Sequence, residues 1–332
     1  MKVGFFGVNE QQKKDYFINS FRALEISFLD QDLDDENIPT QNDFDIISVF
    51  VKSKITPKVI DAFPSLKMIS VRATGFDNID LNYAKSKNIV VSNVPSYGSH
   101  TVAEFTFGLI LSISRKIPQA IEKVKKEVEF DHEGLKGFDL YGKTLGVIGT
   151  GKIGANVIKI AKGFGMIVQA CDLFPDEKLQ NELNFQYVSL GQLLRESDIV
   201  TIHVPANKET HHLINKDNIM TMKKGAVIIN TARGDVIETE AIYQSISNNH
   251  LSGAGLDVLE SETELGKDLT EEFEPKTMKN VLEDSQLIKN PNVIVTPHTA
   301  FYTTEADQAI TQTTVGNIKA FLNHVPENIV NS

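Results

Sequence analysis

Short apolar runs alternate with helical patterns along most of the 332 residues. Several runs are continuous in Val and Ile, as in parallel strands that are covered on both faces. We predict strands at Lys2–Gly7, Ile46–Val51, Met68–Arg72, Ile89–Asn93, Thr144–Ile148, Ile167–Ala170, Ile199–His203, Ala226–Asn230, Gly253–Asp257 and Val293–Thr296.

Helical patterns with apolar residues three or four positions apart lie between these runs. We predict helices at Glu10–Leu24, Pro57–Phe63, His100–Ser114, Ile153–Phe164, Leu190–Glu196, Lys216–Met222, Thr239–Asn248 and Thr304–Leu322. Such strand–helix alternation predicts an α/β fold with parallel sheets. The least patterned stretch, Glu260–Asn290, is rich in Glu, Lys and Thr, and we expect a surface excursion with short helices there.

The strand–helix units form two series, one before residue 100 and one that begins near Thr144. A length of 332 residues is also about twice the usual ~150 residues of a domain. Between the series lie the helix His100–Lys116 and a polar segment through Gly142. We expect a discontinuous first domain, made of the N-terminal hundred residues and the C-terminal helix, and a continuous second domain.

Charge and composition narrow the classes of function. There are 33 Lys and Arg against 44 Asp and Glu, a net charge of −11, which argues against non-specific nucleic-acid binding. The single cysteine, Cys171, excludes an internal disulfide framework and a multi-cysteine zinc site, so we expect no metal. No long stretch is uniformly apolar, and residues 1–5 lead directly into a strand. We therefore expect a cytoplasmic protein without a membrane partner.

A glycine-rich segment follows the strand Thr144–Ile148 and precedes a helix. Gly149–Gly154 has the form G-x-G-x-x-G, in which the first glycine permits a tight turn, the second admits a pyrophosphate and the third allows close helix–strand packing. The helix N-terminus adds free N–H groups and a positive dipole end. Asp172, eighteen residues after Gly154, is placed to accept hydrogen bonds from a ribose 2′-OH. These features predict a dinucleotide site that prefers NAD to NADP.

The candidate proton donor is His298, which follows a strand in Thr296–Ala300, at the end of the sheet where α/β sites form. Imidazole titrates near neutral pH and can give a proton to a developing alkoxide. The alternative is a histidine that only caps the strand. His203 also ends a strand, and there we favour a structural or cofactor-lining role.

Arg233 follows the strand Ala226–Asn230, where its guanidinium can clamp a substrate carboxylate. The alternative is a surface salt bridge. Glu262, five residues after Asp257, would stabilise the protonated imidazole if it contacts His298. The residues alone do not choose among Glu260, Glu262 and Glu264, and solvated acidic loops are common. Beside Asp172, Cys171 is expected to fill the edge of the core.

Four sequence motifs, in their order along the chain, resemble those of a known enzyme family. Gly149–Gly154 with Asp172, Asn230–Gly234, Asp257–Glu262 and Thr296–Ala300 resemble the D-isomer-specific 2-hydroxyacid dehydrogenases, over nearly the whole chain. The nearest branch is the D-lactate dehydrogenases, which the stretches Asn93–Tyr97 and Thr296–Thr303 and the long excursion between Glu262 and His298 resemble.

The resemblance implies two Rossmann-like domains with the active site in the cleft between them, and a homodimer. The substrate domain would be residues 1–99 plus 300–332, and the NAD-binding domain residues 100–299. It assigns His298 as general acid and base, Glu262 as its partner and Arg233 as the anchor of the substrate carboxylate.

The resemblance also implies the residues that bind each ligand. For the cofactor, NAD, they are Gly149, Gly151, Lys152, Ile153, Gly154, Asp172, Val204, Pro205, Thr210, Thr231, Ala232, Arg233 and Asp257. For the substrate they are Thr74, Gly75, Tyr97, Arg233, His298 and Phe301, with Phe50 as a further lining residue. One departure stands out, because Gly98-Ser99-His100 replaces the Ser-Pro that relatives usually carry after the tyrosine. It puts the hinge and the pocket rim in question, and we expect His100 itself to cap the helix or lie on the surface.

The function implied is an NAD-dependent D-2-hydroxyacid dehydrogenase that interconverts pyruvate and D-lactate. One alternative is a sister enzyme for bulkier 2-oxo acids, such as 2-oxoisocaproate or phenylpyruvate, since pocket volume sets that preference. A second is 3-phosphoglycerate, formate or glyoxylate chemistry on the same scaffold. A third is an NAD(H)-sensing binding module without turnover.

Overall fold

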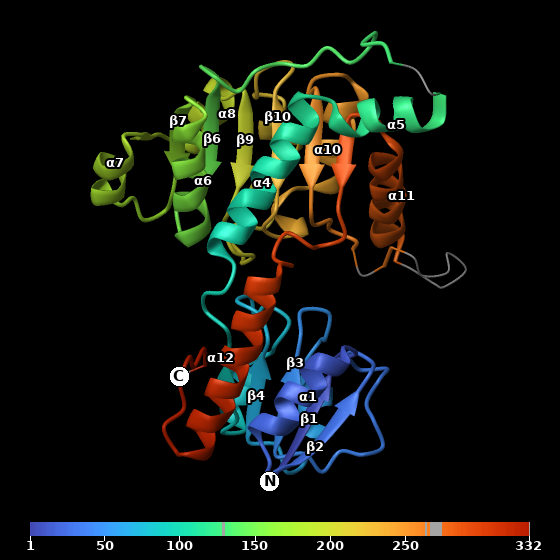
Figure 1. The fold of residues 1–332 in the computed structure, drawn as a ribbon, viewed down its shortest axis with the longest axis vertical. Helices are drawn as coiled ribbons and strands as arrows, with labels where there is room; N and C mark the ends of the chain where they lie inside the picture. The colour runs from blue at the N-terminus through green and yellow to red at the C-terminus, as the bar shows by residue number, and fades with distance from the viewer. Residues whose placement is uncertain (128–129, 263, 266–273, 332) are drawn as a thin grey trace. The chain divides into compact units, whose positions relative to one another are not determined.

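The computed structural model describes residues 1–127, 130–262, 264–265 and 274–331 (Figure 1). The chain divides into two compact units. The first unit is Met1–Tyr97 with Thr303–Ser332, and the second unit is Gly98–Tyr302. Each unit is built on one parallel sheet, so the predicted α/β class with parallel sheets is confirmed.

The first unit has a five-stranded sheet in the order β2-β1-β3-β4-β5. Its strands are β1 (Lys2–Phe6), β2 (Glu25–Leu29), β3 (Ile46–Val49), β4 (Met68–Val71) and β5 (Val90–Ser92). Its helices are α1 (Gln11–Ser20), α2 (Pro57–Asp61), α3 (Leu81–Ser86) and α12 (Thr304–Leu322). The sequence analysis missed β2, whose short edge strand is only partly buried and alternates Ile26 and Phe28 with polar residues.

Adjacent phenylalanines of β1 show how this sheet is covered. Phe5 stacks on Phe17 of α1, with ring centroids 4.2 Å apart, and shares a buried cluster with Ile318 of α12. Phe6 points to the opposite face and meets the edge of Phe63, with ring centroids 6.2 Å apart. Helices α1 and α12 therefore cover one face of the sheet (Figure 1).

The second unit has a seven-stranded parallel sheet in the order β12-β11-β10-β9-β6-β7-β8. Its strands are β6 (Thr144–Ile148), β7 (Ile167–Cys171), β8 (Gln186–Tyr187), β9 (Ile199–Ile202), β10 (Val227–Asn230), β11 (Gly253–Leu256) and β12 (Val293–Val295). Its helices are α4 (Ser99–Ser114), α5 (Ile117–Glu127), α6 (Lys152–Gly163), α7 (Glu177–Leu183), α8 (Leu190–Glu196), α9 (Lys216–Ile219), α10 (Thr239–Ser247) and α11 (Pro275–Lys289), with a 3-10 turn at Gly234–Val236.

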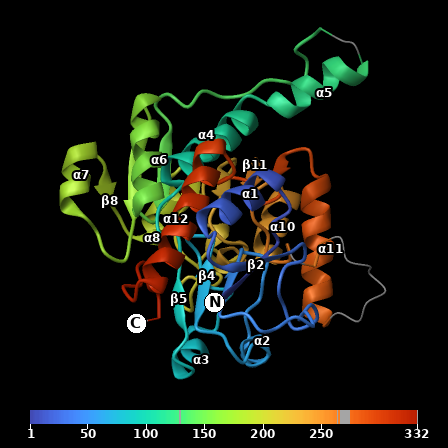
Figure 2. The same ribbon diagram turned by 60° about the horizontal axis from the view of Figure 1, so that its bottom comes forward.

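Two helical layers cover this sheet. Phe107 of α4 and Val157 of α6 share one buried cluster with Val147 of β6, whereas Leu193 of α8 and Ile242 of α10 belong to the cluster on the other face. Figure 2 shows α7 and β8 at one edge of the sheet and α11 at the other. The chain order reverses at β6, which lies between β9 and β7. In such sheets ligands bind outside the carboxyl ends of the strands at this reversal.

Some elements differ from the prediction. Within Glu260–Asn290 we expected short helices, which is wrong for the described part, because Pro275–Lys289 forms one helix of 15 residues. Residues 263 and 266–273 of that stretch lie outside the described residues. The segment after α4, treated as polar, contains α5, whose apolar residues Ile117, Ile121 and Val124 face solvent. Helices α3 and α7 and strand β8 are also additions. Among the described residues, no helix is long and apolar enough to cross a membrane.

Candidate active site

The glycine-rich turn after β6 fits a pyrophosphate. Gly149 has φ +91°, and a Cβ there would lie 2.6 Å from the carbonyl oxygen of His203. A Cβ on Gly154 would lie 2.0 Å from the carbonyl oxygen of Gly149, so α6 can approach β6 closely only because this residue is glycine. Gly151, the N-cap of α6, has open space around its Cβ position and no side-chain cap on the helix. The free N–H groups of a 12-residue helix thus face room for a phosphate group.

Asp172 lies just beyond the end of β7 and contacts this turn directly. One carboxylate oxygen accepts hydrogen bonds from the backbone N (2.6 Å) and Oγ1 (2.8 Å) of Thr150, and the other from the backbone N of Phe174 (2.9 Å). Burial raises the pKa of this carboxyl, but the hydrogen bonds from Thr150 and Phe174 outweigh it and leave the pKa below its usual value. Asp172 is therefore a negative charge beside the turn, which disfavours a 2′-phosphate.

The neighbouring Cys171 is partly buried against the core, and burial raises the pKa of its thiol. A raised pKa keeps the thiol protonated near neutral pH, and a thiol is a far weaker nucleophile than a thiolate. The geometry thus supports the interpretation of Cys171 as a packing residue.

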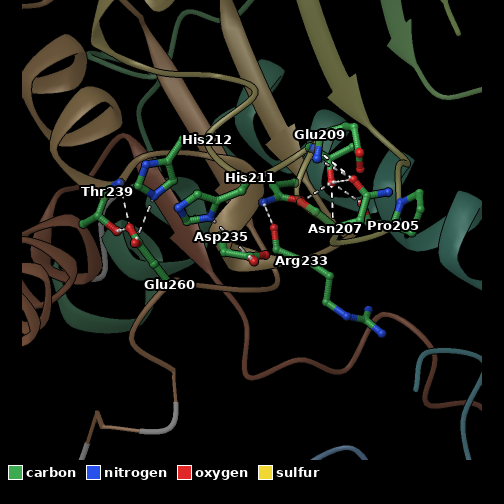
Figure 3. Close-up of polar contacts among 11 residues, drawn as sticks. Pro205, Asn207, Glu209, His211, His212, Arg233, Asp235, Thr239 and Glu260 are labelled. Carbon is green, nitrogen blue, oxygen red and sulfur yellow. Dashed lines mark hydrogen bonds and ion pairs between the residues drawn. The ribbon is translucent and has the colours of Figure 1, made fainter. Parts of the chain in front are cut away.

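The residues that follow β9 are held by local hydrogen bonds. Thr210 Oγ1 donates to the carbonyl oxygen of Pro205 (2.6 Å), and Asn207 Oδ1 accepts from the backbone N of Thr210 (3.0 Å; Figure 3). His203 Nε2 lies 2.9 Å from Thr201 Oγ1, and burial lowers the pKa of this imidazole to about 3. His203 is neutral at pH 7 and cannot serve as a proton donor there, which agrees with the structural role favoured from the sequence.

Arg233 follows β10 on a turn that Asn230 fixes. The Asn230 side chain is buried, donates to the carbonyl oxygen of Arg233 (2.8 Å) and accepts from the backbone N of Ala232 (3.0 Å). Thr231 is anchored in turn by Thr106 of α4, with 3.0 Å between the two Oγ1 atoms. The role of Asn230 was not predicted from the sequence, although a polar residue at the end of a buried strand is a usable signal.

Asp257 organises the loop that carries His298. Its carboxylate is 1% exposed and accepts hydrogen bonds from Thr296 Oγ1 (2.5 Å) and from the backbone N of Thr299 (2.9 Å) and Ala300 (2.8 Å). Burial raises the pKa of Asp257 despite these bonds. The His298 N–H donates to the carbonyl oxygens of Asp257 and Thr296, both at 2.9 Å, and this holds His298 at φ +55°, a conformation that costs a non-glycine residue about 1 kcal/mol.

Glu262 is the acidic residue that meets His298. The distance between Glu262 Oε1 and His298 Nδ1 is 3.0 Å, and the side chains are 39% and 23% exposed. Glu260, an alternative that the sequence left open, pairs instead with His212, and Glu264 donates its backbone N–H to the carbonyl oxygen of Ser261. With Nδ1 facing Glu262, the Nε2 atom of His298 is the ring nitrogen left to exchange a proton with a ligand.

The remaining predicted residues are placed as follows. Thr74 and Gly75 follow β4 in the first unit, where Thr74 Oγ1 donates to the carbonyl oxygen of Val94 (2.9 Å) and the Thr74 carbonyl accepts from Asn93 Nδ2 (2.7 Å). Tyr97 is the last residue of the N-terminal segment of the first unit, and Phe50 packs on the core of that unit. In the second unit, Phe301 meets Tyr302 edge to face, and His100 is exposed in the first turn of α4.

Two comparisons with known sequences bear on this arrangement. Residues 107–300 match the family model described as the NAD-binding domain of D-isomer-specific 2-hydroxyacid dehydrogenases. The chain is also 36% identical to the D-lactate dehydrogenase of Escherichia coli over 325 residues, which cover 96% of each chain.

Solved structures give the same picture. A D-lactate dehydrogenase from Aquifex aeolicus, complexed with NAD and lactic acid, shares 36% identity over 99% of each chain, with a TM-score of 0.88. A D-2-hydroxyisocaproate dehydrogenase shares 29% identity and a TM-score of 0.82 over the full length of both chains.

Proposed function

Because the chain belongs to the D-isomer-specific 2-hydroxyacid dehydrogenase family, and is therefore an NAD-dependent oxidoreductase, we propose that it interconverts pyruvate and D-lactate. The observation that carries the proposal is the His298–Glu262 pair, at the carboxyl edge of a sheet whose β6–α6 turn fits NAD. The similarity to D-lactate dehydrogenases, 36% identical over at least 96% of each chain, supports lactate as the 2-hydroxy acid.

The proposed chemistry rests on three side chains of the second unit. When bound, NADH supplies a hydride to the carbonyl carbon of the 2-oxo acid. His298 Nε2 gives a proton to the developing alkoxide oxygen, and Glu262 stabilises the imidazolium through Nδ1, 3.0 Å from its carboxylate. Arg233 holds the substrate carboxylate with charge-assisted hydrogen bonds, which orients the carbonyl carbon. In the reverse direction His298 accepts the proton from the hydroxyl group.

We propose that the cofactor lies along the carboxyl edge of the second sheet. The helix N-terminus at Gly151 would hold the pyrophosphate and Asp172 the adenosine ribose. The other proposed contacts are Gly149, Lys152, Ile153, Gly154, Val204, Pro205, Thr210, Thr231, Ala232, Arg233 and Asp257. Within this set Asp257 has a second task, because its carboxylate already holds the backbone of Thr299 and Ala300.

Substrate contacts beyond His298 and Arg233 stay predictions. We propose that the backbone N–H groups at Thr74 and Gly75 bind the substrate carboxylate and that Tyr97 and Phe301 line the pocket. The location of the active site in a cleft between two domains, the domain boundaries and the cytoplasmic location likewise stay predictions.

We further propose a homodimer that uses α5. Its residues Ile117, Ile121 and Val124 are 41%, 48% and 39% exposed and recur at helical spacing. Ile117 and Ile121 also line a cavity of about 500 Å³, together with Ser112 and Pro118. A row of exposed apolar side chains of this kind is typical of a surface that a partner covers. Light scattering coupled to gel filtration measures the mass of the assembly, and a monomer at all concentrations would contradict the proposal.

The first test follows NADH absorbance with purified protein and pyruvate, 2-oxobutyrate, 2-oxoisocaproate, phenylpyruvate and hydroxypyruvate. Each assay is repeated with NADPH, and chiral analysis assigns the product. We expect the highest kcat/KM with pyruvate and NADH, with D-lactate as the product.

Other outcomes would move the proposal in defined directions. A preference for 2-oxoisocaproate would keep the mechanism and favour the second candidate, a D-2-hydroxyisocaproate-type enzyme, to which the chain is similar at 29% identity. Tight NADH binding without turnover on any 2-oxo acid would indicate an NAD(H)-sensing module.

A further inference from the structure

A second histidine–carboxylate pair lies close to the first in sequence. His212 Nε2 is 3.0 Å from Glu260 Oε1, and the side chains are 20% and 13% exposed (Figure 3). Glu260 stands two residues before Glu262 on the loop after β11. Glu260 was one of the three acidic residues that the sequence left open as the partner of His298, and the proposed mechanism uses neither Glu260 nor His212.

Both carboxylate oxygens of Glu260 take part in hydrogen bonds within the protein. Oε2 accepts hydrogen bonds from Thr239 Oγ1 (2.9 Å) and from the Thr239 backbone N (3.2 Å), while Oε1 faces His212. Burial raises the pKa of Glu260, but the bonds from His212 and Thr239 outweigh it and leave the pKa below its usual value. The group is thus a bonded anion near neutral pH.

These contacts join three consecutive loops at the carboxyl edge of the second sheet. We call residues 203–215 the β9 loop, residues 231–238 the β10 loop and residues 257–262 the β11 loop. His212 belongs to the β9 loop and donates its backbone N–H to the carbonyl oxygen of Asp235 in the β10 loop (2.9 Å). Thr239 directly follows the β10 loop as the first residue of α10, and Glu260 belongs to the β11 loop.

The β10 and β11 loops also touch through their backbones. A Cβ on Gly234 would lie 2.1 Å from the carbonyl oxygen of Leu259, so the loop that carries Arg233 lies directly against the residue before Glu260. Glu260 ties the same two loops together one residue further on. In Figure 3 the guanidinium of Arg233 extends away from His212, Glu260 and Thr239. The cluster therefore holds the loop that carries Arg233, while the guanidinium points away from the cluster.

We propose that Glu260, supported by His212, is a positioning residue that sets the spacing of Arg233 from the Glu262–His298 pair. The inference rests on the proposed function, in which Arg233 anchors the substrate carboxylate while His298 serves the carbonyl oxygen. These two groups must match the two ends of a small 2-oxo acid at once. A misplacement of about 1 Å can cost ~10²-fold in rate, so the distance between the β10 and β11 loops matters directly.

The test compares three variants of the full-length protein. Glu260→Ala removes all three contacts, whereas Glu260→Gln keeps an oxygen for Thr239 and an amide for His212. Glu240→Gln is the matched control, because Glu240 is an acidic residue of α10 that pairs with Lys279 on the outside of the unit (2.8 Å). Each variant is assayed at least 10 °C below its own unfolding midpoint.

We expect Glu260→Ala to lower kcat/KM for the 2-oxo acid at least ~10-fold, mainly through KM. NADH affinity should fall less than kcat/KM does, because the proposed pyrophosphate and ribose contacts, at the glycine-rich turn and Asp172, stand on other strands. Glu260→Gln should recover most of the loss, and Glu240→Gln should match the wild type. Equal kcat/KM in Glu260→Ala and the wild type would overturn the proposal, as would a Glu260→Gln variant as impaired as Glu260→Ala.

Hydrogen–deuterium exchange separates this inference from the proposed function. Amide exchange in peptides that cover residues 231–239 and 257–262 should be faster in Glu260→Ala than in Glu240→Gln. If the wild type reduces no 2-oxo acid, the proposed function fails, and the exchange still decides whether Glu260 holds these loops. Unchanged exchange in both segments would overturn the inference whatever the substrate.

Discussion

Two histidine–glutamate pairs on the same edge of one sheet have different surroundings. In both, the imidazole nitrogen and the carboxylate oxygen are 3.0 Å apart, and both histidines have positive φ, +55° for His298 and +50° for His212. Glu262 is three times as exposed as Glu260, at 39% against 13%. Glu260 also bonds Thr239 twice. The difference teaches that the pairing alone does not assign a role, because the two carboxylates differ in their exposure and in their other partners.

The largest expected effect separates the two pairs. His298→Asn removes the proposed proton donor and should lower kcat at least ~10²-fold, whereas His212→Asn should lower kcat/KM no more than about 10-fold. NADH binding, followed by fluorescence titration, should persist in both variants. Steady-state kinetics with the best 2-oxo acid make the comparison, and equal losses in the two variants would contradict the division of roles.

The second prediction concerns Arg233, which lies in the β10 loop. Arg233→Gln removes the proposed charged anchor of the substrate carboxylate. A charge-assisted hydrogen bond contributes about 1.5–3 kcal/mol, so kcat/KM for the 2-oxo acid should fall roughly 10- to 100-fold, mostly through KM. Arg195→Gln, at an exposed site near the end of α8, is the matched control. An unchanged KM would mean that another residue holds the substrate carboxylate.

The smallest expected effect concerns a third acidic group beside the same turn. Asp284 of α11 is 1% exposed and accepts a hydrogen bond from the backbone N of Ser261, the residue between the two glutamates (3.3 Å). Burial raises the pKa of Asp284 to about 7, and the bond from Ser261 does not offset it. The charges of Glu260 and Glu283 act in the same direction as burial.

The sign of the pH dependence follows from this raised pKa. Between about pH 4 and 7 the unfolded chain ionises Asp284 while the folded protein keeps it protonated, so its contribution to stability falls as pH rises. The free energy of unfolding of Asp284→Asn, relative to that of the wild type, should therefore rise with pH. The increase should be on the order of 2 kcal/mol between pH 4.5 and pH 7.5. Denaturant unfolding at the two pH values measures it, and a difference that shrinks as pH rises would contradict the pKa assignment.

The parts of the site that could be predicted from the sequence are those formed by residues close together in the chain. The glycine-rich turn was recognisable because strand, glycines and helix are contiguous, and Asp172 follows at the next strand end. The loops that end at Arg233 and His298 were placed correctly on one sheet edge, since parallel strands bring their carboxyl ends together. The choice between Glu260 and Glu262 was not available from spacing and depended on resemblance.

The rest depended on contacts between distant segments. Glu260 meets His212 and Thr239 only because three separate loops meet after folding. Asn230 and Asp257 were noticed as motif members, but the backbone groups that they hold are set by how each loop turns. Helix α11 was not predicted because charged residues interrupt its apolar pattern. Of its buried residues Val281, Asp284 and Leu287, one is an acid.

Because Gly234 approaches Leu259 closely, position 234 accepts only glycine without a shift of the backbone. Every amino acid except glycine carries a Cβ atom, and that atom would stand 2.1 Å from a backbone oxygen, which is not a flexible side chain that can swing aside. Even the methyl group of Gly234→Ala would push apart the segments that carry Arg233 and Glu262. Any substitution at position 234 would therefore displace the segment that carries Arg233 relative to the segment that carries Glu262.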